Sequence, residues 1–473
     1  MVVLAEKLGI PGVVVTAPGF AEQARSTGYF NGVPDLQVAV YPGAFDTHSE
    51  AQLIDNTTKI VFPNIIDSLT KPIVPGEKRD LEPKPAATVF SGDIDEINRY
   101  FADKGWSDGM AITPPTVGKI EEFLKYTDLP PDQEIAVLPA AYLRATPWNI
   151  AVNGVMAGCR PEYLPILIAY VRAIGESAGA RMFFGSTHSW IPYLWVNGPL
   201  GRQLEIDHGQ GLIGYQTNAA IGRTLGLIVT NLAGFRIKQS RMGTFGYTVS
   251  WALAEDEEYC LRIGWEPYHM QKGFDLNAST VTATTSTMWG QNNIPAVSDI
   301  TPEIVMQLIA REMTYKSVFA SGASGSNNRT VLITPPVAKV LAAGRYTKHS
   351  LEEDLVKTAG LTTFEYTFSQ VYGSFGAKRL PFHEQLAENL TGLGSQKGKL
   401  PPWYPRFPGW EEIATTHYIE ANKTAILVCG DESRNKTQTL PGGSVITKKI
   451  ELPEKWNELM HEAGYRPLEE FYL

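Results

Sequence analysis

The most reactive side chain in a suggestive setting is the thiol of Cys159, which stands in the run Gly-Cys-Arg-Pro-Glu. Gly158 permits a turn and Pro161 presets the first helical φ, so Cys159 is expected at or beside the start of a helix over residues 161–177. The helix dipole and Arg160 would then lower the pKa of the thiol, and the thiolate would serve as a nucleophile or a soft metal ligand. The equally weighted alternative is a small buried residue packed under a helix start, because free cysteines are often buried.

His188 is a candidate general base. It follows the strand-like residues 181–184, and α/β proteins usually carry their sites at strand ends. The alternative, which the residue type favours, is a structural or solvated histidine in a loop.

A run of four acids that begins with Glu255 follows an expected strand over residues 245–254, and Glu266 and His269 come shortly afterwards. Carboxylate and imidazole donors suit Mn, Fe or Zn, and they also suit an acid/base pair. No fixed spacing such as His-Glu-x-x-His supports the metal hypothesis, and an acidic run usually marks a solvated strand end. A divalent transition metal is therefore one candidate cofactor, and the cofactor stays unknown.

Two features predict contact with an anion. The glycine-rich residues 207–214 lack the GxGxxG and Walker patterns, so no nucleotide motif is present, but the glycines would let the backbone approach a small substrate while Arg223 holds its carboxylate. The repeated Ile-Thr-Pro-Pro sequence, with threonines at Thr113 and Thr334, predicts two strand ends that lead into helix N-termini. An ordinary loop and an ordinary helix start are the favoured alternatives.

Six motifs occur in an order that resembles the UGSC family, which is named for a selenocysteine- or cysteine-Gly-Ser-Cys motif. They cover residues 108–116, 156–163, 196–199, 218–223, 265–269 and 279–282. The resemblance implies a bacterial α/β protein with redox or thiol chemistry. No Cys-Gly-Ser-Cys is present, and residues 4–15 are similar to the segment that follows that loop in the family. We therefore expect either a partner chain that supplies the loop or a protein that works without it.

Length and composition indicate which classes of protein fit this chain. A chain of 473 residues with 43% hydrophobic residues is long enough for two or three compact units. The 41 basic and 50 acidic residues leave no basic run for nucleic acid. The longest apolar run, residues 164–174, is far shorter than the roughly 20 residues of a membrane span. Three widely spaced cysteines and an N-terminus unlike a signal peptide predict a cytoplasmic protein with reduced thiols.

The positions of apolar residues predict an α/β fold with a small N-terminal parallel β/α layer and a larger mixed α/β domain. We expect the partial layer over residues 1–70, a linker over 71–86 that is rich in proline and charge, and a catalytic domain of one or two lobes over 87–473. Helices are expected at residues 116–126, 161–177, 217–232 and 302–319, and strands at 88–91, 245–254 and 279–289.

The first functional hypothesis is an enzyme that transforms a small anionic organic substrate by lyase, reductase or hydrolase chemistry. Its candidate catalytic residues are Cys159, His188, Glu255 and His269, and its candidate substrate-binding residues are Thr113, Asn153, Arg160, Asn197, Arg223 and Glu266. The alternative is a non-catalytic subunit of a hetero-oligomer, completed by a partner that bears Cys-Gly-Ser-Cys. In both cases we expect a second subunit or a homo-oligomer, and neither nucleic acid nor membrane.

Overall fold

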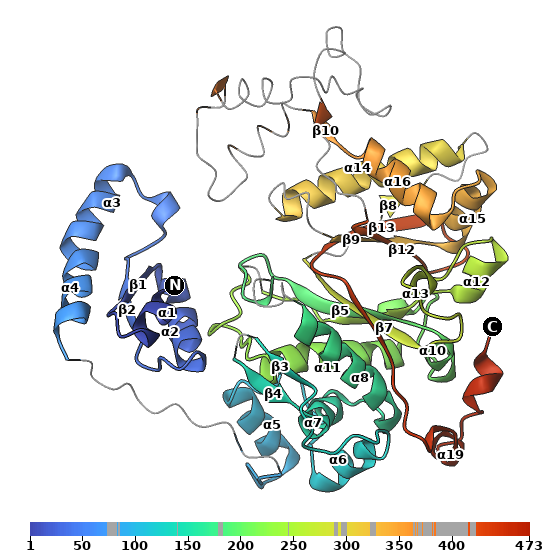
Figure 1. Cartoon of the computed structure of the whole chain (residues 1–473), viewed down its shortest axis with the longest axis horizontal. Coiled ribbons are helices and arrows are strands. Elements are labelled where there is room, and N and C mark those ends of the chain that lie inside the picture. The colour runs from blue at the N-terminus through green and yellow to red at the C-terminus, as the bar shows by residue number, and fades with distance from the viewer. Residues whose placement is uncertain are drawn as a thin grey trace. The chain divides into compact units, whose positions relative to one another are not determined.

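A small parallel sheet near the N-terminus and a larger mixed sheet are the main sheets of the computed structural model, beside small antiparallel pairs of strands (Figure 1). The structure describes residues 1–72, 83, 86–139, 141–177, 183–244, 246–287, 292–294, 300–321, 328–362 and 422–473, with isolated positions between 365 and 416. The expected α/β class, with its small parallel layer and larger mixed part, is confirmed.

The chain forms two compact units, each built from separate stretches of sequence. The first unit comprises Met1–Trp190, Arg223–Ser250 and Leu452–Glu454, and the second comprises Ile191–Gly222, Trp251–Glu451 and Lys455–Leu473. Most of the expected linker over residues 71–86 lies outside the described residues, so that boundary stays a prediction.

The N-terminal layer has the parallel β/α arrangement that the sequence predicts. Strands β1 (Val13–Thr16) and β2 (Gln37–Val40) pair in parallel, and α2 (Ala21–Phe30) connects them. A helical stretch follows over α3 (Glu50–Asn56), a π-helical turn and α4 (Phe62–Thr70), and it starts at a capping box in which Ser49 accepts from the backbone of Gln52. Val61 from this stretch packs with Ala39 and Tyr41 in a small core.

Helices dominate the rest of the first unit. They are α5 (Ile94–Asp103), α6 (Val117–Leu124), α7 (Pro147–Ala157), α8 (Leu164–Glu176) and the second half of α11 (Gln216–Asn231), beside the hairpin of β3 (Ala136–Leu138) and β4 (Leu143–Ala145). α8 is buried along most of its length, as its apolar sequence requires. The expected strand over residues 88–91 is wrong, because these residues run without sheet pairing. Of the strand-like residues 181–184, the first two lie outside the described residues, and Phe183 and Phe184 are helical.

The second unit is built on the mixed sheet. Its strand order is β12 (Thr424–Val428), β9 (Asn328–Ile333), β13 (Lys436–Gly442), β7 (Thr280–Ser286), β5 (Ile191–Asn197) and β6 (Trp251–Ala254). β14 (Ile446–Lys449) also pairs with β7, and β8 (Asn292–Asn293) with β13. The expected strand over residues 245–254 is therefore ordered as a strand only in its last four residues, β6.

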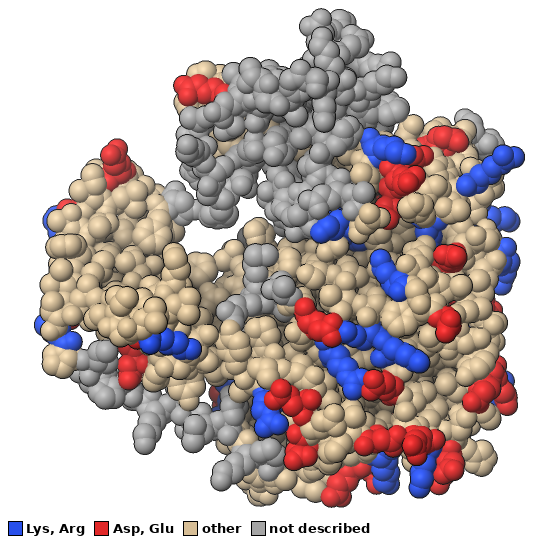
Figure 2. Space-filling model, viewed as in Figure 1, with Lys and Arg blue, Asp and Glu red and all other residues tan. Residues whose placement is uncertain are grey.

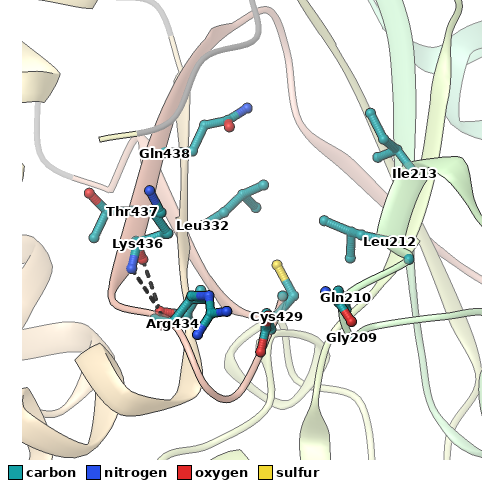
Figure 3. Close-up of a pocket in the computed structure, with 14 residues that line it drawn as sticks. Gly209, Gln210, Leu212, Ile213, Leu332, Cys429, Arg434, Lys436, Thr437 and Gln438 are labelled. Carbon is teal, nitrogen blue, oxygen red and sulfur yellow. Dashed lines mark hydrogen bonds between the residues drawn. The ribbon is translucent and has the colours of Figure 1, made fainter. Parts of the chain in front are cut away.

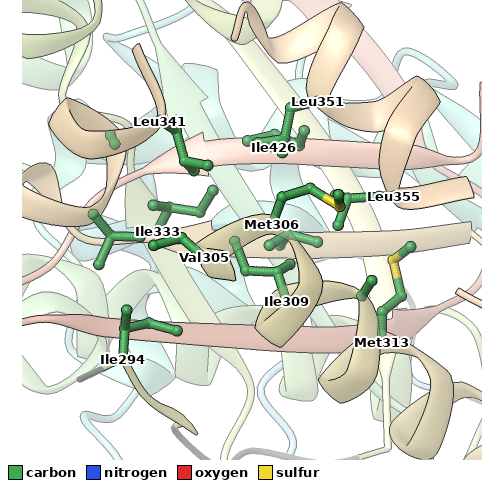
Figure 4. Close-up of a cluster of buried hydrophobic side chains, with 14 of the residues drawn as sticks. Ile294, Val305, Met306, Ile309, Met313, Ile333, Leu341, Leu351, Leu355 and Ile426 are labelled. Carbon is green, nitrogen blue, oxygen red and sulfur yellow. The ribbon is translucent and has the colours of Figure 1, made fainter. Parts of the chain in front are cut away.

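Alternation along these strands divides the side chains between the two faces of the sheet. Ile333 and Ile426 face α14 (Pro302–Ser321), α15 (Pro335–Ala343) and α16 (Lys348–Thr358) in one apolar core (Figure 4). Leu332 pairs with Leu427 and Gln438 in the register, so these three side chains lie on the other face. The second face carries the candidate site.

Two expectations from the sequence concern the distribution of charge on the surface and the absence of a membrane-spanning helix. On the face shown in Figure 2, acidic and basic side chains are interspersed, as the near balance of the two signs leads one to expect. Among the helices that the structure describes, none combines the length and the apolar character that crossing a bilayer demands.

Candidate functional site

Glu255, at the carboxyl end of β6, lies at the centre of a buried network of charged and polar groups in the second unit. Its carboxylate accepts hydrogen bonds from Asn197 Nδ2 at 2.9 Å and from the Tyr268 backbone N at 2.7 Å, and it pairs with Lys348 Nζ. Burial acts to lower the pKa of Lys348, but the Glu255 carboxylate raises it, and the net shift is upward. Glu255 thus joins the ends of β5 and β6 to α13 (Tyr268–Gln271) and α16.

Glu257, in the first turn of α12 (Glu257–Arg262), forms the second half of this network. It accepts from Asn197 Nδ2 at 3.1 Å and pairs with Arg202. His269 Nδ1 lies 3.3 Å from Glu257 Oε1, outside hydrogen-bond geometry, while its Nε2 lies 3.1 Å and 3.0 Å from two backbone carbonyl oxygens. Because both carboxylates are buried and engaged by several donors, the network positions the loops at these strand ends.

A cleft of about 440 Å³ lies on the sheet face opposite α14–α16 (Figure 3). One wall is the glycine-rich loop at residues 209–213, and the other consists of residues 429–431, Arg434 and the first residues of β13, with Leu332 and Thr334 between them. We call this space the cleft.

The loop wall is held by its own polar groups. Asp207 accepts from the backbone N of Leu212, and the Asn218 side chain bonds both the N and the O of Asp207, each at 2.8 Å. Gly430 N donates to His208 O at 2.6 Å and thereby docks the loop against the end of β12. Leu212 has φ +33°, which is strained for a branched residue, and such strain is typical of functional sites.

Three kinds of polar group face the cleft. The Gln438 side chain is only 4% exposed, and its Nε2 has no hydrogen-bond partner in the part of the chain that the structure describes. Arg434 and Lys436 stand on the same side, Arg434 exposed at the mouth. The Cys429 sulfur points into the space (Figure 3). Burial, with help from Glu255, raises the pKa of this thiol, so it is neutral at pH 7.

The second Ile-Thr-Pro-Pro copy does border the cleft, but it offers few groups to an anion. The Thr334 hydroxyl donates to the carbonyl oxygens of Arg434 at 2.7 Å and Lys436 at 3.1 Å. Pro335 and Pro336 occupy the first turn of α15 and have no N–H to donate. In the first copy, Thr113 N donates to Met156 O at 3.3 Å, and α6 begins only at Val117.

Cys159 does not have the environment that its sequence predicts. Gly158, at φ +83°, ends α7, and Cys159 follows this C-cap before a short 3-10 turn over Pro161–Tyr163. The thiol is buried, and its sulfur lies 3.1 Å from Thr224 Oγ1. Burial raises its pKa to about 12, so the expected low pKa is wrong and the alternative of a packed core residue is favoured.

The two arginines that were candidates for binding the substrate form hydrogen bonds to other groups of this chain. Arg223 Nε and Nη2 donate to the Asp108 carboxylate at 2.8 Å and 2.9 Å, and Nη2 also reaches the carbonyl of Ala111 at 2.9 Å. An internal carboxylate thus occupies the guanidinium group of Arg223, and its role in holding a substrate carboxylate stays a prediction that these contacts do not favour. Arg160 donates to Tyr163 Oη at 2.7 Å and lies 3.2 Å from Glu162.

The remaining candidates lie apart from the network. His188 is exposed, with Nδ1 3.4 Å from Ser186 Oγ, and Glu266 is exposed beyond α12. Asn153 is buried on α7, where it donates to Asn149 O at 2.8 Å and accepts from Asn231.

No three His, Cys, Asp or Glu side chains within the described ranges are arranged to hold a metal ion, so the metal hypothesis gains no geometric support.

Sequence reasoning thus found part of the network and missed most of the cleft. Of the candidates, the structure brings together Asn197, Glu255 and His269. The residues that we did not single out are Arg202, Glu257, Lys348, Arg434 and Gln438, and Cys429 was interpreted as core. One signal was available for Cys429: alternation with Ile426 and Val428 puts it on the opposite face of its strand.

Known proteins add no identification. No family model, no curated protein and no solved structure matches the chain.

Proposed function

We propose that the chain is an enzyme acting on a small anionic organic substrate that binds in the cleft. The observation that carries the proposal is the unpartnered, buried Nε2 of Gln438 in a space of about 440 Å³, beside Arg434 and Lys436. A buried donor without an acceptor costs about 1–3 kcal/mol, and a ligand oxygen would remove that cost. The volume is within the range of small-molecule sites.

Cys429 replaces Cys159 as the proposed reactive thiol, because it is the cysteine that lines the cleft. Its raised pKa makes it a neutral hydrogen-bond donor at the cleft. A nucleophilic role requires that a base removes its proton once the substrate is bound. Lyase, reductase and hydrolase chemistry all accommodate such a step.

Binding is tested with the full chain by thermal shift against small carboxylates, phosphates and their neutral amides. We expect a carboxylate to raise Tm where its amide does not, and Arg434→Met to diminish that rise. Lys357→Met is the matched control, because Lys357 is an exposed cation on α16, on the other side of the sheet. A panel in which no anion raises Tm, or in which both variants behave alike, would contradict the proposal.

A second candidate function is a subunit that needs a partner chain. The observation that favours it is the number of exposed apolar side chains in the N-terminal layer, which include Leu8 at 78%, Ile54 at 60% and Phe62 at 57% exposure. Apolar surface of this kind typically marks an interaction site. Light scattering on natively purified protein tests it: an active species of 52.0 kDa alone would rule out an obligate partner.

Membership of the UGSC family, a bacterial source and a cytoplasmic location belong to the same proposal. Six motifs in one order support the family, and three free cysteines suit a reducing compartment.

A further inference from the structure

We infer that the ligand of the cleft is a short oxo or hydroxy carboxylic acid, bound along the start of β13 with its carboxylate toward Arg434 and Lys436 and its second oxygen at Gln438. This inference rests on the proposed function, since it concerns the same cleft, and it adds the class of substrate and its orientation.

The spacing of the polar side chains comes from strand geometry. Lys436 and Gln438 are two residues apart on β13, so their side chains leave the same face of the strand from Cα atoms about 6–7 Å apart. Thr437, between them, turns to the opposite face and donates to Glu312 at 3.0 Å. In Figure 3, Thr437 points away from the cleft while Gln438 extends across it. For a ligand that meets both cleft-facing groups, we infer two polar ends about four carbons apart.

The two ends of the cleft require different chemistry. Arg434 and Lys436 supply positive charge near the mouth, where a carboxylate stays partly hydrated. Gln438 is buried, and its neutral amide can both donate to and accept from a ligand, which suits a keto oxygen or a hydroxyl group.

The middle of the cleft is apolar. Leu332 lies opposite Gln438 in the register, and Leu212 and Ile213 line the facing wall (Figure 3). A short hydrocarbon stem suits these side chains better than a second charge does. An inorganic anion would reach Arg434 but would leave the Gln438 amide unpaired.

Calorimetric titration of the full chain with 4-oxopentanoate and pentanoate tests the inference, because the two acids differ only in the oxygen at the fourth carbon. We expect 4-oxopentanoate to bind about 10- to 100-fold more tightly, since pentanoate leaves the buried amide without a partner. Gln438→Met should remove this preference, and Arg434→Met should weaken both acids by a similar factor.

The outcomes separate this inference from the proposed function. Equal affinities in the wild type, or a preference that survives in Gln438→Met, would overturn the inference and leave anion binding intact. If no small anion binds at all, the proposed function itself fails. Gln438→Glu is the second variant, should Gln438→Met not fold; its carboxylate cannot donate to a keto oxygen, so the preference should also be lost.

Discussion

Lys348→Met should destabilise the protein far more than the loss of a surface cation in the second unit. Lys348 is 3% exposed and pairs with Glu255, which is also 3% exposed. Methionine fills a similar volume but leaves the carboxylate buried without its counter-charge. Asn197 and the Tyr268 backbone still donate to Glu255, so the loss is confined to the charge itself.

The magnitude follows from the burial of both partners. Removing one member of a buried ion pair costs about 3–5 kcal/mol, whereas removing a surface cation costs about 0–1 kcal/mol. With about 2–4 °C of Tm per kcal/mol, the midpoint should fall by about 6–20 °C. The double variant Lys348→Met with Glu255→Gln should lose less free energy of unfolding than the two single variants lose together, because it no longer buries an unpaired charge.

Thermal unfolding and urea unfolding, both followed by circular dichroism, measure the shift in Tm and the loss of free energy. Lys357→Met is the control, since Lys357 is 68% exposed and pairs with Asp354 at 3.2 Å on the same helix. If Lys348→Met shifts the midpoint no more than the control does, the network around Glu255 does not hold the strand ends together.

Three further predictions concern the first unit and the thiols. Arg223→Met should cost about 1–3 kcal/mol in urea unfolding because it leaves Asp108 without its bidentate partner, and a change within error would refute that contact. Burial raises the pKa of Cys159 from 9.0 to about 12, so the unfolded state loses this proton first; stability should be full below about pH 9 and fall toward pH 12, and less so in Cys159→Ser. Iodoacetamide at pH 7 should label Cys159 and Cys429 slowly in the folded protein and rapidly in urea, and fast labelling of folded Cys159 would contradict its burial.

Local patterns were sufficient to predict much of the fold. The helix after Ser49 starts at a side-chain cap, and β1 and β2 show the continuous apolar runs of parallel strands. Such signals involve residues that are close together in the chain, so they can be recognised in the sequence. The strand expected at residues 88–91 failed because its β-forming residues pair with no strand among those that the structure describes.

The environment of Cys159 was mispredicted for a local reason. Gly158 was interpreted as a turn that leads into the next helix, but it is the left-handed C-cap of the preceding one. A thiol just after a C-cap gains nothing from the positive end of a dipole, and burial then determines its pKa.

The candidate site depends on contacts between distant segments, and a single sequence carries no sign of these. Lys348 on α16 reaches Glu255 just after β6, and the loop that contains Leu212 meets Gly430 at the end of β12. Neither of these contacts produces a recognisable spacing of residues in the sequence. In the sequence, Gln438 is one polar residue in a strand. Only its pairing with Leu332 shows that its side chain lies on the cleft face of the sheet.

The most direct test of the central claim is to identify which small molecules the cleft retains. The full-length wild type, Gln438→Met and Lys357→Met are each incubated with a cell extract, separated from unbound compounds, and denatured, and the released compounds are measured by mass spectrometry. We predict that a short organic acid with a second oxygen is enriched on the wild type and on Lys357→Met and is lost from Gln438→Met. Equal retention by all three folded proteins, or retention of no organic anion by the wild type, would contradict it.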